Sequence, residues 1–157
     1  MPLRDDSGPL RRSRVAPPTR RVLYVEDDTS LHEVVAAVLE IEGFEVTAVS
    51  SAAAGLRELS RRRHGVLLTD YHLPDSASCW MLAEARAQGL LWGVPVIVVT
   101  AEQGYVESHG APVLRKPIEF DQLLSVLRGT LEHRARATSG VHRVSAELGR
   151  AKRKAAS

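Results

Sequence analysis

The segment from Arg21 to Asp28 constrains the fold of this chain more than any other. It reads Arg-Val-Leu-Tyr-Val and then continues at once with Glu26, Asp27 and Asp28. A continuous apolar run is typical of a strand covered on both faces, as in a parallel sheet. The acidic residues then fall at the carboxyl end of that strand, which is the edge where parallel sheets form sites. The segment therefore predicts an α/β fold with an acidic site.

The same arrangement recurs further along the chain. Apolar runs lead into Asp70, into Thr100 and, more weakly, into Lys116. Because the carboxyl ends of parallel strands share one edge, we expect five side chains to converge there: Glu26, Asp27, Asp70, Thr100 and Lys116. Carboxylates, a hydroxyl and an ammonium together suit a hard cation and a phosphoryl group.

Apolar periodicity assigns the secondary structure between these points. Strand patterns cover 22–25, 44–49, 66–69, 94–99 and 111–114, and helical faces cover 31–39, 52–62, 78–88 and 120–131. Ser30 and Glu33 have the spacing of a capping box for the first helix, and Gly43 suits its end. Pro112 favours an edge position for the last strand.

Strands that alternate with helices through short loops predict right-handed βαβ units. We therefore expect a doubly wound, flavodoxin-like sheet of five parallel strands in the order 2-1-3-4-5. The fifteen residues between Thr100 and Lys116 must supply a strand and two loops. An average helix of about 11–12 residues does not fit there, so the fourth helix should be shortened or absent.

Charge divides the chain into three parts. Residues 1–19 carry four Arg against two acids, 20–131 carry ten Lys or Arg against fifteen acids, and 132–157 carry seven against two. This pattern predicts a disordered basic arm, an acidic domain over 20–131, and a basic tail that is partly helical or disordered. An acidic domain argues against nucleic acid as a partner.

Neither a disulfide nor a membrane span is expected. The chain has a single cysteine, Cys79, and no apolar run near the roughly 20 residues that cross a bilayer. The N-terminal residues lack the apolar core of a secretory signal. We therefore expect a cytoplasmic protein without a membrane partner.

The motifs at the four strand ends resemble those of response-regulator receiver domains in two-component signalling. They read Val-Glu-Asp-Asp28, Asp70-Tyr-His-Leu-Pro, Val-Val-Thr100-Ala and Lys116-Pro117. They occur in the order of the family, and the resemblance covers about residues 20–131. It implies a receiver fold and a role as a response regulator.

The resemblance also implies a site chemistry. Asp70 would accept a phosphoryl group from a histidine kinase or a histidine phosphotransfer protein. Glu26 and Asp27 match the acidic pair that holds Mg²⁺, together with Asp70 and the backbone carbonyl of His72. Clustered carboxylates repel one another, and a bound dication relieves that repulsion.

Two further residues take roles from the family pattern. Thr100 matches the hydroxyl that contacts the phosphoryl oxygens, and Lys116 matches the family lysine, whose bond to Pro117 is expected to be cis. The implied protein is not an enzyme acting on other substrates. It is a phosphoacceptor that catalyses its own phosphotransfer and slow autodephosphorylation.

Departures from the pattern keep alternatives open. Ser78 stands where the family usually has glycine, and Val113 where an aromatic residue is common, so the usual aromatic switch should be missing. One alternative is a pseudo-receiver, an interaction module that phosphorylation does not regulate. A second is a DNA-associated regulator acting through the basic tail. A third, a dehalogenase-type enzyme, needs an acid at position 72, where this chain has His72.

The C-terminal part predicts how the protein would signal. Only 26 residues lie beyond Leu131, too few for a winged-helix or similar output domain with its own core. We therefore expect a stand-alone, single-domain regulator that signals through contacts with a protein target or through phosphorelay. The target is not identified by the sequence, and homodimer formation is left open.

Overall fold

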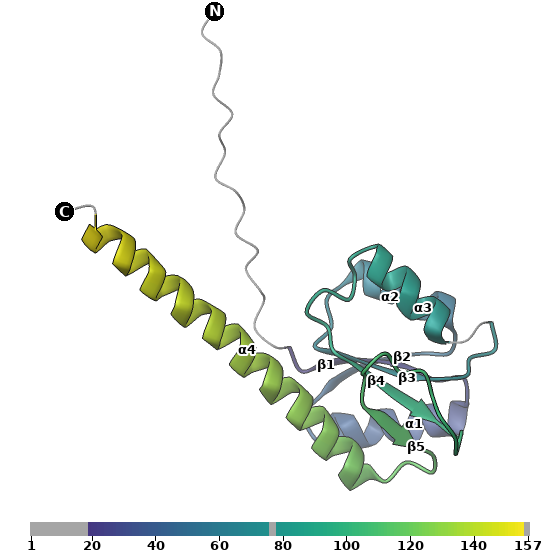
Figure 1. Ribbon diagram of the computed structural model, residues 1–157. Helices are drawn as coiled ribbons and strands as arrows, with labels where there is room; N and C mark the ends of the chain where they lie inside the picture. Colours follow the sequence, from purple (N-terminus) through teal and green to yellow (C-terminus); the bar gives the residue numbers. More distant parts are fainter. Residues whose placement is uncertain (1–18, 76–77, 156–157) are drawn as a thin grey trace, which may run out of the picture.

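A five-stranded parallel sheet with helices on both faces forms the body of the protein (Figure 1). The computed structural model describes residues 19–75 and 78–155. The strands are β1 (Arg21–Val25), β2 (Glu45–Val49), β3 (Val66–Asp70), β4 (Val96–Thr100) and β5 (Val113–Arg115). The helices are α1 (Thr29–Ile41), α2 (Ala52–Arg61), α3 (Ser78–Ala87) and α4 (Phe120–Ala155). The strand order β2-β1-β3-β4-β5, parallel throughout, confirms the predicted doubly wound fold.

The sheet separates two apolar cores, which explains why its central strands are apolar at consecutive positions. In β1, Val22 and Tyr24 pack with α1 and α4, whereas Leu23 and Val25 pack with α2 and α3. All four side chains are fully buried. Burial on both faces fixes the strand in the sheet and holds its carboxyl end rigidly at the edge.

Helix α1 begins two residues earlier than the capping-box pattern predicted, because its cap is Asp28 rather than Ser30. Asp28 has an extended backbone, and its Oδ1 accepts the N–H of Leu31 at 3.1 Å. Ser30 already lies inside the helix, so the prediction of a Ser30–Glu33 capping box is wrong. A carboxylate is as good a cap as a serine and also stabilises the positive end of the helix dipole, which favours the earlier start. Gly43 follows the helix with φ 85°, as expected for its end.

The connection between β4 and β5 contains no helix. Residues 101–112 are described throughout, and none of them is helical, as the short interval predicted. Strand β5 is shorter than expected and begins at Val113 rather than at residue 111. Pro112 lies just before it and accepts the N–H of Val98 through its carbonyl at 2.9 Å, which places the proline at the sheet edge.

Helix α4 continues far beyond the sheet (Figure 1). It has 36 residues and is therefore about 54 Å long. Its first turns pack on the sheet through Leu123, Leu124 and Leu127, and its backbone stays helical through Gly140 and Gly149. Residues 1–18 of the predicted basic arm lie outside the described residues. The division of the chain at residue 131 stays a prediction.

No helix in the described part of the chain is both long enough and apolar enough to cross a membrane.

Candidate functional site

Three carboxylates meet at the carboxyl edge of the sheet. Glu26 and Asp27 follow β1 directly, and Asp70 is the last residue of the neighbouring strand β3. One oxygen of each of the three lies within 4.8 Å of the others. Glu26 and Asp70 are buried, whereas Asp27 is exposed. The predicted convergence of these side chains is therefore present, and the site is open to solvent on the Asp27 side.

Lys116 brings an ammonium group into the same cluster. It follows the edge strand β5, and its Nζ lies 2.5 Å from Asp70 Oδ2 and 2.8 Å from Glu26 Oε2. Both bonds are short, as charge-assisted hydrogen bonds are. Three carboxylates against one ammonium leave the fully ionised cluster with two net negative charges. The Lys116–Pro117 peptide bond is cis, as expected.

Glu26 is the most enclosed member of the cluster. Its Oε2 accepts a hydrogen bond from the Tyr24 hydroxyl at 3.3 Å, and its Oε1 accepts the N–H of Asp28 at 3.1 Å. Burial raises the pKa of Glu26, the charge of Asp70 raises it further, and the hydrogen bonds from Lys116 and Asp28 oppose this. Glu26 is thus a carboxylate whose charge needs a nearby cation.

The cation that meets this need is Lys116. Burial by itself would lower the pKa of Lys116, but hydrogen bonds to Asp70 and Glu26 outweigh burial and hold the pKa above its ordinary value. The lysine therefore keeps its charge at neutral pH. Burial and the neighbouring charge of Glu26 raise the pKa of Tyr24, so the phenol stays protonated and can donate.

Tyr24 was predicted only as a core residue, and its hydrogen bond to Glu26 is an addition from the structure. The ring does lie in the core, but its hydroxyl reaches the site. Two residues apart on a strand, Tyr24 and Glu26 lie on the same face. That spacing is the signal in the sequence that could have found this contact.

His72 and Thr100 lie beside the cluster without pointing a side chain into it. The N–H of His72 donates to Asp70 Oδ1 at 3.1 Å, while its exposed imidazole reaches Glu102, with Nε2 and Oε1 2.8 Å apart. Thr100 is fully buried at the end of β4, and its Oγ1 accepts the N–H of Glu102 at 3.0 Å. Both residues thus connect the site to Glu102, which the sequence did not indicate.

The donor set fits a small hard dication. Carboxylate oxygens are the ligands that Mg²⁺ prefers, and it commonly uses one or two of them together with water. The exposed Asp27 leaves room for such water molecules. Two positive charges would also neutralise the net charge of the ionised cluster.

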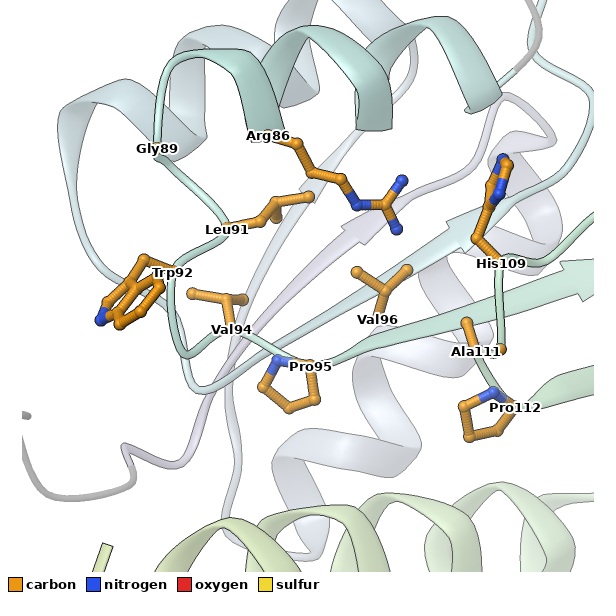
Figure 2. Close-up of a pocket in the computed structure, with 11 residues that line it drawn as sticks. Arg86, Gly89, Leu91, Trp92, Val94, Pro95, Val96, His109, Ala111 and Pro112 are labelled. Atoms are coloured by element: carbon orange, nitrogen blue, oxygen red, sulfur yellow. The ribbon is translucent and has the colours of Figure 1, made fainter. Parts of the chain in front are cut away.

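The hollow drawn in Figure 2 lies away from this edge. One pocket of about 460 Å³ is bordered by Trp92, Val96 and Pro112, at the amino ends of β4 and β5 (Figure 2). Because the strands are parallel, these ends lie opposite to the carboxylates. The candidate site is therefore a charged surface at the sheet edge rather than the hollow of Figure 2.

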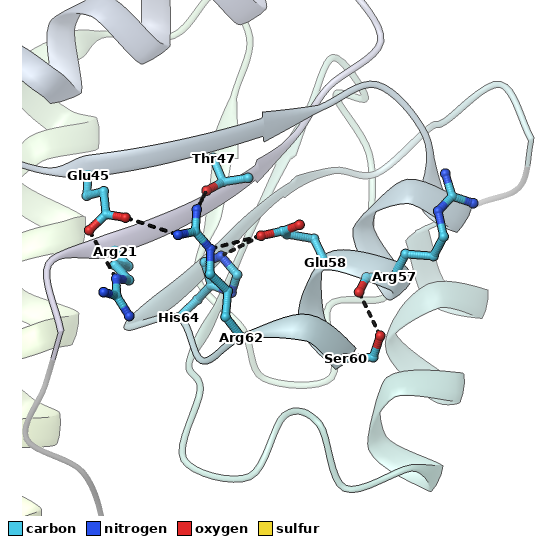
Figure 3. Close-up of polar contacts among 8 residues, drawn as sticks. All are labelled: Arg21, Glu45, Thr47, Arg57, Glu58, Ser60, Arg62 and His64. Atoms are coloured by element: carbon cyan, nitrogen blue, oxygen red, sulfur yellow. Dashed lines mark hydrogen bonds and ion pairs between the residues drawn. The ribbon is translucent and has the colours of Figure 1, made fainter.

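A second group of charged side chains lies at the end of α2 (Figure 3). Arg62 donates to Glu58 at 2.9 Å, to Glu45 at 3.2 Å and to Thr47 at 2.6 Å. The buried ring of His64 lies beside them, with Nε2 3.9 Å from Glu58 Oε1. This distance is too long for a hydrogen bond. Burial lowers the pKa of His64, so the group is a structural network with a neutral histidine.

Comparison with known proteins agrees with this geometry. The family model of the response regulator receiver domain matches residues 22–128. The sensory transduction protein RegX3 of Mycobacterium tuberculosis is 33% identical over 116 residues, which are 70% of this chain and 50% of RegX3. The chain thus spans about half the length of this relative.

Solved structures show the same likeness. The CheY-like response regulator receiver domain protein from Methanospirillum hungatei is 28% identical, with a TM-score of 0.66 over 76% of this chain and 98% of that one. The receiver domain of the hybrid histidine kinase CckA is 26% identical, with a TM-score of 0.63 over 71% and 98%.

Proposed function

Because the chain belongs to the response regulator receiver domains of two-component signalling, we propose that its Asp70 accepts a phosphoryl group from a histidine kinase or a histidine phosphotransfer protein. The observation that carries this proposal is the position of Lys116 Nζ, 2.5 Å from Asp70 Oδ2, in a cluster that also holds Glu26 and Asp27. The ammonium of Lys116 can bind the incoming phosphoryl oxygens. The two further carboxylates can act with Asp70 as ligands of a metal cation.

The proposed step is a displacement at phosphorus. An oxygen of the Asp70 carboxylate forms a bond to the phosphorus of a phosphohistidine, and the phosphorus–nitrogen bond breaks. The imidazole, protonated on its other nitrogen, leaves as a neutral ring that keeps the electron pair of the broken bond. Hydrolysis later returns the carboxylate when water attacks the phosphorus and inorganic phosphate departs. Such transfers depend mainly on positioning and charge neutralisation.

The residues around Asp70 have separate tasks in this step. The N–H of His72 holds Oδ1 and so orients the carboxylate. Lys116 is bound to Oδ2 through a long flexible stem, and its ammonium can follow the negative charge onto the phosphoryl oxygens. The Thr100 hydroxyl, at the end of the neighbouring strand β4, would turn from the Glu102 N–H and donate to one of these oxygens once they are present.

Glu26, Asp27 and Asp70 would hold the Mg²⁺ ion of this site, with the carbonyl of His72 as the further protein ligand that the sequence suggested. When bound, the ion offsets negative charge on the carboxylates and on the transferred group. Glu26 contributes to the ion site through its charge and also fixes Lys116, at 2.8 Å.

A change at Asp70 has to reach other proteins to act as a signal. We propose that the phosphorylated protein signals through contacts with a protein target or passes the phosphoryl group onward. Asp27 and His72 are exposed at the site, so a donor protein can approach from this side.

Mass measurement after treatment with acetyl phosphate and Mg²⁺ tests the proposal. The wild type should gain the mass of one phosphoryl group, and the gain should need Mg²⁺. Asp70→Asn should not gain it. Asp121→Asn is the matched control, because Asp121 is an exposed aspartate in the first turn of α4. Equal labelling of the wild type and Asp70→Asn would refute the assignment of Asp70.

One observation favours a second function, that of an interaction module without phosphorylation. Residues 101–112 form no helix, and Val113 supplies no aromatic ring, so parts of the usual output surface are missing. Thermal unfolding with beryllofluoride and Mg²⁺, which mimic a phosphoryl group, separates the two functions. A phosphoacceptor should unfold at a higher temperature in their presence, whereas the interaction module should unfold at the same temperature.

A further inference from the structure

The segment 101–112 has neither the internal hydrogen bonds of a helix nor much apolar burial to fix its position. Val106 is the only buried residue among these twelve, all of which the structure describes. Apolar burial therefore fixes the segment at one point, near its middle. The half that begins at Ala101 is exposed over residues 101–105, so only polar contacts can hold it in one position.

Arg115 provides this anchor. It pairs with Thr100 across β4 and β5, and paired residues of parallel strands point to the same face of a sheet. Its guanidinium donates to two backbone carbonyls of the segment, that of Glu102 through Nη1 and that of Gly104 through Nη2, the latter at 2.9 Å. A planar guanidinium can bind two acceptors at once in a fixed geometry, which a lysine ammonium does less well.

Glu102 is the residue on which these contacts meet. Its carbonyl accepts from Arg115, its N–H donates to Thr100 Oγ1 at 3.0 Å, and its carboxylate lies 2.8 Å from His72 Nε2. The N–H of His72 in turn binds Asp70 Oδ1. A continuous chain of contacts therefore runs from the phosphoacceptor through Glu102 to the Thr100 hydroxyl and to Arg115.

We propose that Arg115 is a positioning residue that holds the Thr100 hydroxyl in its resting orientation by tethering Glu102. The inference rests on the proposed function and adds how that site is coupled to the segment 101–106. When a phosphoryl group on Asp70 engages the Thr100 hydroxyl, the Glu102 N–H loses its acceptor and the tethered segment shifts. In a chain with Val113 in place of an aromatic ring, this tether couples the site to the surface.

The affinity for beryllofluoride with Mg²⁺ measures how strongly the two hydrogen bonds of Arg115 oppose the shift of the segment. Arg115→Met removes both anchoring hydrogen bonds and keeps much of the apolar stem. Because releasing the segment no longer costs these bonds, Arg115→Met should bind the mimic about fivefold more tightly than the wild type, as expected for about one net hydrogen bond. Arg115→Lys, which retains the charge, should fall between the two.

A double-mutant cycle separates this role from general loosening. In a Thr100→Ala background, Arg115→Met should leave the affinity for the mimic unchanged, because the effect passes through the missing hydroxyl. Arg128→Met is the matched control, since Arg128 is a similarly exposed arginine paired with Glu42 away from the site. An affinity change of the same size in both backgrounds would overturn the proposal.

Amide hydrogen exchange of residues 102–106 gives a readout that needs no phosphoryl chemistry. Without the mimic, exchange should be several-fold faster in Arg115→Met than in the wild type or in Arg128→Met. With the mimic, the wild type should reach the rate of the variant. If the wild type binds the mimic but exchange in Arg115→Met is unchanged, the role of Arg115 is refuted and the proposed function is not. Failure of the wild type to bind the mimic would refute the proposed function, and the coupling with it.

Discussion

Replacing Lys116 by methionine should destabilise the protein strongly in the absence of Mg²⁺. The lysine is the cation bound to Glu26 and Asp70, whose side chains are 1% and 8% exposed. Removing one partner of a buried ion pair costs about 3–5 kcal/mol, because the remaining charge is left buried. Lys116 is itself 21% exposed, so water reaches the position, and we expect the lower end, about 3 kcal/mol.

Urea unfolding followed by circular dichroism at pH 7 measures this loss. Arg128→Met is the matched control, because Arg128 pairs with Glu42 on the surface, where such pairs contribute about 0–1 kcal/mol. Adding Mg²⁺ should restore much of the stability of Lys116→Met, since the ion offsets the same carboxylates. Acidification should also narrow the difference in unfolding free energy, because burial raises the pKa of Glu26 and this carboxylate loses its charge as the pH falls. A Lys116→Met variant within about 1 kcal/mol of the wild type would refute this electrostatic reasoning.

Three further predictions concern the scaffold. Burial lowers the pKa of His64 in the folded protein. The unfolding free energy should therefore be highest above the ordinary histidine pKa of about 6.5 and fall as the pH drops below it. His64→Phe should reduce this fall, as measured by urea titrations at pH 7.5 and 5.5. Gly129→Ala should raise the unfolding free energy by up to about 1 kcal/mol, because a Cβ there meets nothing. Gly65→Ala should instead lower it sharply or prevent folding, because its Cβ would lie 1.8 Å from the carbonyl oxygen of Thr19; equal effects of the two glycine substitutions would contradict the packing described. Asp75→Ala should cost about 1 kcal/mol in the same assay, because the Asp75 carboxylate accepts the first two N–H groups of α2 at 2.9 Å; an unchanged urea midpoint would exclude that capping role.

The convergence of the charged side chains could be predicted from the sequence because it depends on topology. Apolar runs of strand length mark β1 and β3, and alternation with helices makes the sheet parallel. A residue that ends a strand or directly follows one must then lie at the same edge, which places Glu26, Asp70 and Lys116 together. No knowledge of side-chain geometry is needed for that step.

Contacts that depend on the path of a loop could not be predicted in this way. The anchoring of Glu102 by Arg115 joins residues thirteen positions apart through an irregular segment. Its geometry follows from the missing helix and has no periodicity to reveal it. The predicted start of α1 was wrong for a related reason. Asp28 and Ser30 are both good caps, and the turn after β1 decides between them.

The length of α4 could not be predicted from single residues. Gly140 and Gly149 each disfavour a helix by about 1 kcal/mol relative to alanine, and the sequence therefore left residues 132–157 between helix and disorder. In the structure the helix continues to Ala155, since the residues around the glycines include many alanines, arginines and lysines, which favour helices. Local propensity summed over the segment outweighs the two glycines.

Chemical mapping of the phosphorylated residue tests the central claim most directly. Borohydride reduces an aspartyl phosphate to homoserine, which peptide mass spectrometry locates in the chain. After treatment with acetyl phosphate and Mg²⁺, we predict homoserine at position 70 and at no other aspartate. Homoserine at Asp27 or elsewhere, or none in a protein that is folded and binds Mg²⁺, would contradict the account.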